Sequence, residues 1–266
     1  MVYEHITLTR SDEGIVTLTF NRPETRNSMT PAMGDEVVAA VGEIRADSQA
    51  RVFVLTGAGK AFSSGGDLGM LARDSGAASG GGPSMLGAPR DFYARYLALR
   101  QLAIPTIAAI NGHAIGAGLC IALACDLRMA ASDAKMGMTF AKLGIHPGMG
   151  ATYFLPRLIG TARAAELFFT GRVFDAAEAE RLGVINRAVP REQLHDQVMA
   201  LAREIAGCAP LAVRMTKKAL YRGGEHSLDD MLDFEALQQG ITFTTDDARE
   251  GVLAIMEKRT PKFRGA

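Results

Sequence analysis

The stretch RVFVLTGAGKAFSSGGDL, residues 51–68, decides the fold, because an apolar run passes through a loop of small residues into the start of a helix. The run over 51–56 predicts a short buried strand, and the pattern near 68–72 predicts a helix. A second apolar run, Pro105–Ile110, leads in the same way through Asn111–Gly118 into a helix. Repeated strand–loop–helix units indicate an α/β protein.

Regular structure extends on both sides of these units. Alternating apolar residues over 5–10 and 15–21 predict an N-terminal hairpin. Thr30 and Pro31 can begin a helix that runs to Ala46, and Asp126–Ala131 predicts a third strand. Asp74–Ala88 is almost entirely Ser, Gly, Ala and Pro, which predicts a mobile loop.

From Met149 onward the spacing predicts helices only. The expected helices cover Thr161–Thr170, Ala176–Leu182, Gln193–Ala206, Leu211–Tyr221, Ser227–Phe243 and Asp246–Lys258. Sheet-forming units therefore come first and helices last, and no linker near residue 150 separates independent domains. One core with a helical extension fits this order.

Composition excludes several function classes. The 266 residues include 29 Lys plus Arg against 29 Asp plus Glu, so no net charge favours unselective binding of nucleic acid or anionic membranes. The longest apolar run is far shorter than the roughly 20 residues that cross a bilayer, and residues 1–10 resemble no targeting signal. The three cysteines form no CxxC pair, so we expect a soluble cytoplasmic protein without a metal site.

The two glycine-bearing loops point to stabilisation of an anion. A strand that leads through glycines into a helix can aim free backbone N–H groups at a negative charge. The loop around Gly65 and Gly66 lacks the Walker spacing and the GxGxxG spacing, which argues against nucleotide hydrolysis and hydride transfer. The alternative is that these glycines, with Gly116 and Gly118, only permit tight turns and close packing.

The sequence resembles the crotonase superfamily, that is, enoyl-CoA hydratases and isomerases, over nearly the whole chain. The matching segments are Asn21-Arg22-Pro23 with Asn27, Thr56-Gly57 with Ala61–Leu68, Asn111–Gly118, Cys125-Asp126-Leu127, Leu143–Gly150 and Asp246–Lys258. The resemblance implies a spiral of ββα units over 1–205 and a helical trimerisation region over 206–266. It also implies a homotrimer or a dimer of trimers that takes acyl-CoA thioesters, with CoA present only as part of the substrate.

The resemblance further assigns an oxyanion hole. In the family, two backbone N–H groups hold the thioester oxygen as it becomes an enolate, and the matching positions are Gly66 and Ala117. Physically this agrees with the reading of the two loops, because donors aimed at a developing oxyanion lower the barrier of thioester chemistry.

Two positions depart from the family pattern. Its hydratases use two glutamates to activate water and deliver a proton, and Cys120 and Phe140 stand at those positions here. Apolar surroundings raise the pKa of a thiol, and phenylalanine carries no transferable proton. Hydration by the two-glutamate route is therefore not expected, and single-base isomerisation from the Phe140 position is equally disfavoured.

Other groups could move protons in the same cavity. His146 lies in the turn before Pro147-Gly148, where it could act as an acid or base or could merely shape the turn. Weaker candidates are Asp74, Tyr93, Tyr96 and Tyr153. Cys120 could be a nucleophile, although a buried small hydrophobe is the simpler interpretation.

The resemblance also suggests contacts to CoA. The matching strip contains Ala61, Ser63, Ser64, Gly65 and Leu68. Asp67 would support this loop, with helix capping as the competing account, and Arg26 could pair with a CoA phosphate. Phe243 and Lys258 match a segment that often completes the CoA pocket of a neighbouring subunit.

These observations predict an acyl-CoA enzyme that stabilises a thioester enolate. Three alternatives stay open: decarboxylation of a malonyl-type thioester, thioester hydrolysis with His146, and a non-catalytic acyl-CoA-binding subunit. The fold cannot choose among them.

Overall fold

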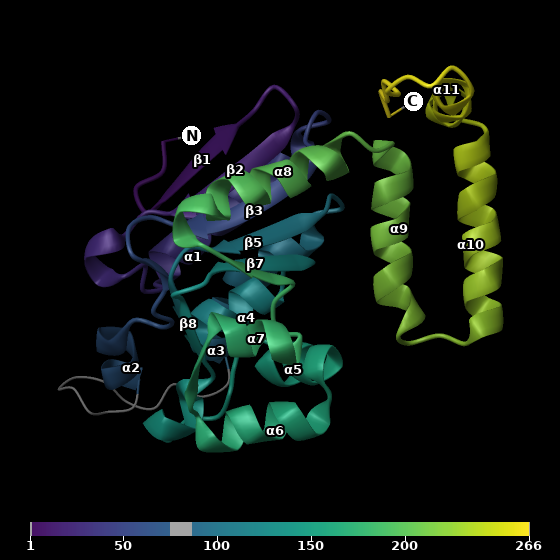
Figure 1. The fold of residues 1–266 in the computed structure, drawn as a ribbon. Helices are drawn as coiled ribbons and strands as arrows, with labels where there is room; N and C mark the ends of the chain where they lie inside the picture. The colour runs from purple at the N-terminus through teal and green to yellow at the C-terminus, as the bar shows by residue number, and fades with distance from the viewer. Residues whose placement is uncertain (1, 75–86, 266) are drawn as a thin grey trace.

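The strands within residues 2–74 and 87–265, the part of the chain that the computed structural model describes, form two sheets (Figure 1). The larger sheet has six strands in the order β1-β2-β3-β5-β7-β10, and the smaller has four in the order β4-β6-β8-β9. Their bounds are Ile6–Arg10 (β1), Ile15–Phe20 (β2), Val52–Gly57 (β3), Ala61–Ser63 (β4), Thr106–Ile110 (β5), His113–Ile115 (β6), Leu127–Ala131 (β7), Lys135–Gly137 (β8), Val173–Asp175 (β9) and Arg187–Val189 (β10).

Each repeating unit contributes one strand to each sheet. β3, β5 and β7 are parallel neighbours, with Val54 opposite Ile107 and Ala108 opposite Arg128. β4, β6 and β8 follow them in the chain and are parallel neighbours in the smaller sheet. This confirms the spiral of ββα units, and it places the loops after β4 and after β6 next to each other.

The helices follow from local signals that the sequence carries. Thr30 caps α1, since its hydroxyl accepts a hydrogen bond from the backbone N–H of Met33 at 3.3 Å, and Pro31 occupies the first turn. Ser227 and Asp230 form a capping box at the start of α10. The bounds are Pro31–Ala46 (α1), Leu68–Asp74 (α2), Gly87–Leu97 (α3), Ala117–Leu123 (α4), Ala151–Ile159 (α5), Thr161–Thr170 (α6), Ala176–Leu182 (α7), Leu194–Ala206 (α8), Pro210–Gly223 (α9), Leu228–Phe243 (α10) and Asp246–Met256 (α11).

The core lies between the sheets and the helices that cover them. α8 runs along the larger sheet (Figure 1), and every residue of α4 is buried. Phe20, Tyr96 and Phe62 contribute large buried rings, and Phe20 meets the other two edge to face.

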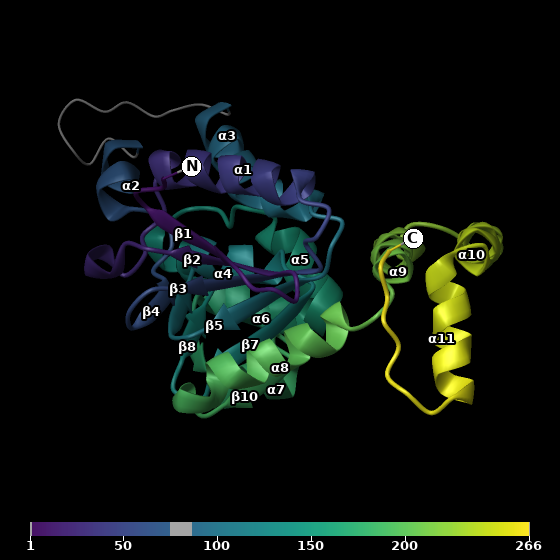
Figure 2. The same cartoon turned by 90° about the horizontal axis from the view of Figure 1, so that it is seen from above.

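The last three helices project from the core (Figures 1 and 2). α9 is tied back through Asp126, which pairs with Lys217 at 2.8 Å and accepts the Tyr221 hydroxyl at 2.5 Å. α8, the last helix on the core, ends at Ala206, and the sequence places the start of the helical region at residue 206. None of the described helices is both long and apolar enough to cross a membrane.

The expectation that only helices follow Met149 was wrong. β9 pairs antiparallel with β8, and β10 pairs parallel with β7, so both lengthen the sheets at their edges. β4 and β6 likewise lie within segments that were expected to be loops. All four strands have three residues, which is too short for a periodic pattern to show. The loop expected over 74–88 falls almost wholly outside the described residues.

Candidate active site

A cavity of about 580 Å³ opens where the two glycine loops meet. Gly65 and Gly66 line it from the loop after β4, and Gly116 and Ala117 line it from the loop after β6. α3 and the segment around Phe140–His146 complete its wall. The two loops that the sequence singles out therefore face one space.

Hydrogen bonds to the chain before α1 set the direction of the first loop. Met29 donates its N–H to the carbonyl of Gly65 at 2.8 Å, and Asp67 donates to the carbonyl of Met29 at 3.1 Å. Met29 and Gly66 thus form a single parallel bridge. Because successive N–H groups of an extended chain point to opposite sides, the N–H of Gly66 points away from Met29.

The second loop presents the first turn of α4. Gly116, at φ +53°, donates its N–H to the carbonyl of Gly137 at 2.8 Å. Ala117 is the first residue of the helix, so its N–H has no partner within the helix. No described residue accepts a hydrogen bond from the N–H of Ala117 or from that of Gly66.

Close contact between the two loops requires a glycine. Gly65 has φ +91°, and a Cβ there would lie 2.6 Å from the carbonyl oxygen of Ile115 and 3.4 Å from the nitrogen of Ala117. The loop that carries Gly66 is therefore packed directly against the start of α4. Two unpartnered donors that line one cavity can hold a developing oxyanion.

Cys120 and Phe140, which the resemblance matches to the family glutamates, carry no acid group. Cys120 is fully buried in α4, and burial raises the pKa of its thiol. It does not line the cavity, which makes it a core residue rather than a nucleophile. Phe140 is largely buried but does line the cavity.

The cavity brings together only some of the expected proton carriers. His146 lines it, is exposed, and has Nδ1 2.7 Å from the carbonyl oxygen of Pro147. Tyr93 also lines it and is half-buried. Tyr96 is buried and donates to the carbonyl of Thr30 at 2.7 Å, and Tyr153 lines a different cavity, so neither belongs to the site. The side chain of Asp74 lies outside the described residues.

The expected CoA strip divides into two groups. Ala61 and Ser63 are buried, and the Ser63 hydroxyl donates to the carbonyl of Asn27 at 2.8 Å and accepts from the N–H of Gly65 at 3.2 Å. These two side chains do not line the cavity and instead stabilise the loop from the core. Ser64, Gly65 and Leu68 line the cavity itself, and contact of any of these residues with CoA remains a prediction.

Asp67 caps the N-terminus of α2, in agreement with the helix-capping alternative for this residue. One carboxylate oxygen accepts from the N–H of Met70 at 3.1 Å, and the other accepts from the Ser28 hydroxyl at 3.2 Å. Arg26 is exposed on the neighbouring turn, and its guanidinium makes no hydrogen bond or ion pair with any described residue. It is free to meet an anionic group.

The two C-terminal residues lie on the projecting helices. Phe243 ends α10 with 72% of its surface exposed, and Lys258 follows α11. Those helices stand well away from α2 and α3, which flank the cavity (Figures 1 and 2). Neither residue lines the cavity of its own chain.

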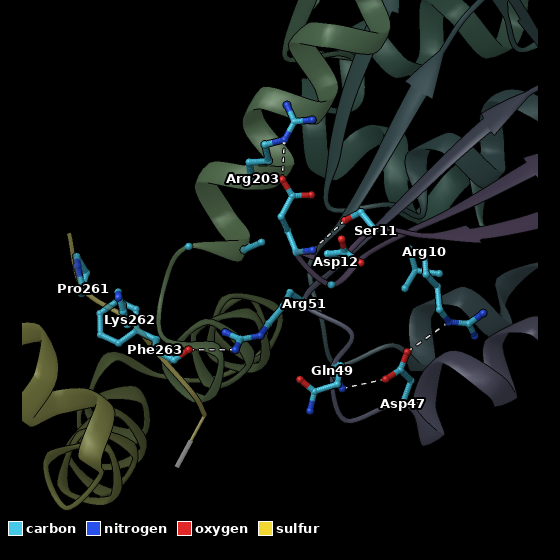
Figure 3. Close-up of a pocket in the computed structure, with 15 residues that line it drawn as sticks. Arg10, Ser11, Asp12, Asp47, Gln49, Arg51, Arg203, Pro261, Lys262 and Phe263 are labelled. Atoms are coloured by element: carbon cyan, nitrogen blue, oxygen red, sulfur yellow. Dashed lines mark hydrogen bonds and ion pairs between the residues drawn. The ribbon is translucent and has the colours of Figure 1, made fainter.

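A second cavity, of about 510 Å³, lies under the C-terminal tail (Figure 3). Arg51 donates to the carbonyl of Phe263 at 3.2 Å, and Arg203 pairs with Glu13 at 3.1 Å. Its lining contains none of the predicted site residues.

The described residues also contain no group of three or more His, Cys, Asp or Glu that could hold a metal ion.

Comparison with known proteins places this geometry in a family. Residues 10–266 match the family model described as enoyl-CoA hydratase/isomerase. The chain belongs to the enoyl-CoA hydratase/isomerase family. It is 38% identical over 263 residues to the "Probable enoyl-CoA hydratase echA8" of Mycobacterium tuberculosis, with 99% of each chain covered. It is 35% identical over 268 residues to the "Crotonyl-CoA hydratase" of Syntrophomonas wolfei, again with 99% of each covered.

A solved structure supports the same family at the level of the fold. The enoyl-CoA hydratase of Bacillus anthracis superimposes with a TM-score of 0.91 at 36% identity, over 99% of this chain and 100% of that one. The expected enzyme family and fold are therefore confirmed. Family membership leaves the reaction open, because the family description covers both hydratases and isomerases.

Sequence reasoning missed several residues of the enoyl-CoA hydratase/isomerase cavity. Asp91 and Arg95 reach it from α3, and Thr139 reaches it from the segment after β8. Arg95 is paired with Asp35 at 2.5 Å, whereas Asp91 is exposed. The amphipathic pattern of 91–102 predicts a helix, but it does not predict which side of that helix faces the glycine loops.

Proposed function

We propose that this chain is an acyl-CoA enzyme that stabilises the enolate of a thioester, with the enolate oxygen bound by the N–H groups of Gly66 and Ala117. The observation that carries the proposal is that both groups border one cavity and find no partner among the described residues. Removal of one such donor from other enzymes lowers kcat by about 10²–10³-fold.

The reaction that fits these residues best is decarboxylation of a malonyl-type thioester. The bond between the α-carbon and the carboxylate breaks, carbon dioxide leaves, and the electron pair moves into the thioester carbonyl to form the enolate. This step needs an oxyanion hole and no base. Neither the buried thiol of Cys120 nor the ring of Phe140 could supply a base.

Hydration of an enoyl thioester is the second candidate, because relatives are named as enoyl-CoA and crotonyl-CoA hydratases. A group must then activate water, and Asp91 and His146 are the residues of the lining that could do so. Thioester hydrolysis with His146 as base, and a subunit that binds acyl-CoA without turnover, are the remaining outcomes.

The lining favours an acyl group that carries apolar carbon besides the carboxylate that leaves. Most of its large apolar side chains come from α2, α3 and the segment after β8: Leu68, Met70, Leu71, Phe92, Phe140, Leu143 and Ile145. Burial of aliphatic carbon against such a wall contributes about 0.8 kcal/mol per methylene group. Arg26 would pair with a CoA phosphate, with the pantetheine arm along Ser64 and Leu68.

We further infer a homo-oligomer, a trimer or a dimer of trimers, in which Phe243 and Lys258 reach the cavity of a neighbouring copy. Neither residue lines the cavity of its own chain, and α10 and α11 stand away from α2 and α3 (Figure 2), which supports this assignment. A cytoplasmic location stays a prediction, since the human relative is named as mitochondrial.

The proposal is tested by removing one donor without removing a side chain. Ala117→Pro deletes the N–H at the first position of α4, where proline fits a helix. We expect turnover of methylmalonyl-CoA to fall about 10²–10³-fold with little change in KM. Ala117→Gly, which keeps the N–H, is the matched control and should retain most of the activity.

Three outcomes would contradict the proposal. Full activity of Ala117→Pro would show that the N–H of Ala117 does not bind the enolate oxygen. Turnover of crotonyl-CoA in preference to methylmalonyl-CoA would establish hydration and direct attention to Asp91 and His146. Tight binding of several acyl-CoA esters without any product would identify a binding subunit.

A further inference from the structure

Tyr93 is the tyrosine of the wall of the candidate active site. It lies on α3, and its half-buried side chain lines the cavity that Gly66 and Ala117 also line. The neighbouring ring of Phe92 is buried and meets that of Tyr93 edge to face, with 6.4 Å between ring centroids. The Tyr93 ring is therefore held in place rather than free in solvent.

The turn after His146 is shaped to receive this hydroxyl. A Cβ on Gly148 would lie 2.4 Å from the Tyr93 hydroxyl oxygen and 2.7 Å from the ring carbon that carries it. Only glycine leaves room for the phenol at this point. Within the described part of the chain no group forms a hydrogen bond with the hydroxyl, so it remains available to a bound molecule.

The surroundings keep the phenol protonated. Desolvation raises the pKa of Tyr93 first, and the nearby Cys120 raises it further. At neutral pH the group can thus donate a proton or a hydrogen bond but cannot serve as a base. It also lies near Cys120, which stands where hydratases of the family carry a glutamate.

We propose that Tyr93 delivers the proton that converts the thioester enolate into product. This inference rests on the proposed function. After carbon dioxide has left, the enolate electron pair forms a bond from the α-carbon to the phenolic hydrogen, and the O–H bond of Tyr93 breaks. The resulting phenolate then takes a proton from water, which restores the enzyme.

Tyr93→Phe tests the proposal with methylmalonyl-CoA as substrate in deuterium oxide. The wild type should place deuterium on one face of the α-carbon of propionyl-CoA. Tyr93→Phe should form propionyl-CoA at least ten times more slowly at steady state, because protonation of the enolate then limits turnover. Its product should carry deuterium on both faces equally, because water then protonates the enolate without direction.

Two further variants separate chemistry from folding. Tyr153→Phe removes a tyrosine hydroxyl that bonds Glu225 outside the cavity, and it should keep both rate and stereochemistry. Gly148→Ala displaces the Tyr93 hydroxyl without deleting it, and it should reproduce the stereochemical loss of Tyr93→Phe. Thermal unfolding checks that each variant is folded.

The outcomes distinguish this inference from the proposed function. If Ala117→Pro abolishes turnover while Tyr93→Phe stays stereospecific at the wild-type rate, the oxyanion hole stands and the role of Tyr93 is overturned. If the wild type leaves methylmalonyl-CoA unchanged, the decarboxylase proposal fails, and the role of Tyr93 in it fails as well.

Discussion

Asn27 shows how a single residue holds the first glycine loop in shape. It is fully buried in the left-handed region at φ +55°. Its amide donates to the carbonyls of Ala58 at 2.9 Å and Ala61 at 2.8 Å, and its side-chain oxygen accepts the N–H of Arg22 at 2.9 Å. Loss of these buried partners would leave backbone groups unsatisfied, at about 1–3 kcal/mol each. These hydrogen bonds thus fix the shape of the loop that carries Gly65 and Gly66.

The three thiols should differ sharply in reactivity. Cys120 and Cys125 are buried, and burial raises the pKa of Cys125 to about 12, whereas Cys208 is exposed. We expect one equivalent of Ellman's reagent to react with the native protein and three to react after denaturation in guanidinium chloride. Cys208→Ser should abolish the native reaction. Rapid modification of Cys120 with loss of activity would restore it as a candidate nucleophile.

At the scale of elements, local signals predict the helices well. Thr30 with Pro31 and Ser227 with Asp230 mark helix starts that the structure confirms. Three-residue strands such as β4 and β10 show no strand pattern in the sequence. They are stabilised by pairing with strands that are distant in the chain, and not by the β-propensity of their own residues. The two glycine loops were identifiable as one site, but the contact of Tyr93 with Gly148 was not. It joins residues 55 positions apart, and no local pattern encodes it.

The C-terminal tail should detach from α11 in acid. Glu250 is held by both terminal nitrogens of Arg259, at 2.6 and 2.8 Å, and by the N–H of Lys262 at 2.8 Å. Arg259 foremost lowers the pKa of Glu250 to about 2, from an ordinary value near 4.5. The stabilisation is therefore complete above about pH 4.5 and is lost as the pH falls towards 2.

Hydrogen exchange of the Lys262 amide measures this effect. We expect its protection to decrease between pH 4.5 and pH 2, after correction for intrinsic exchange rates. In Glu250→Gln the protection should be low throughout and should show no such decrease. A wild-type amide that stays protected at pH 2 would show that other contacts, such as those of Asp247 with the N–H groups of Arg264 and Gly265, hold the tail alone.

At the scale of the whole molecule, the projecting helices expose a large apolar surface. Leu237 on α10 is 64% exposed and Ile255 on α11 is 80% exposed, and a groove between α9 and α10 is lined largely by small and apolar side chains. Surfaces of this kind mark association sites. We therefore expect copies of the chain to associate through these projecting helices.

We expect the protein in solution to have three or six times the 28.3 kDa mass of one chain, as measured by light scattering. Leu237→Asp combined with Ile255→Asp should yield monomers. These monomers should bind acyl-CoA weakly if Phe243 and Lys258 complete a neighbour's site. A fully active monomer would show that each chain builds its site alone.

The complete burial of α4 has a consequence for the response to ionic strength. Mobile ions screen exposed charges over about 8 Å at 0.15 M, but the sides of this helix are packed in the core, so ions can approach it only through the cavity that the bound thioester would fill. Potassium chloride between 0.05 and 1 M should therefore leave kcat nearly unchanged. It should raise KM, because the exposed guanidinium of Arg26 would meet the ligand's phosphates in open water. A steep fall in kcat across this range would mean that electrolyte reaches the reacting carbonyl.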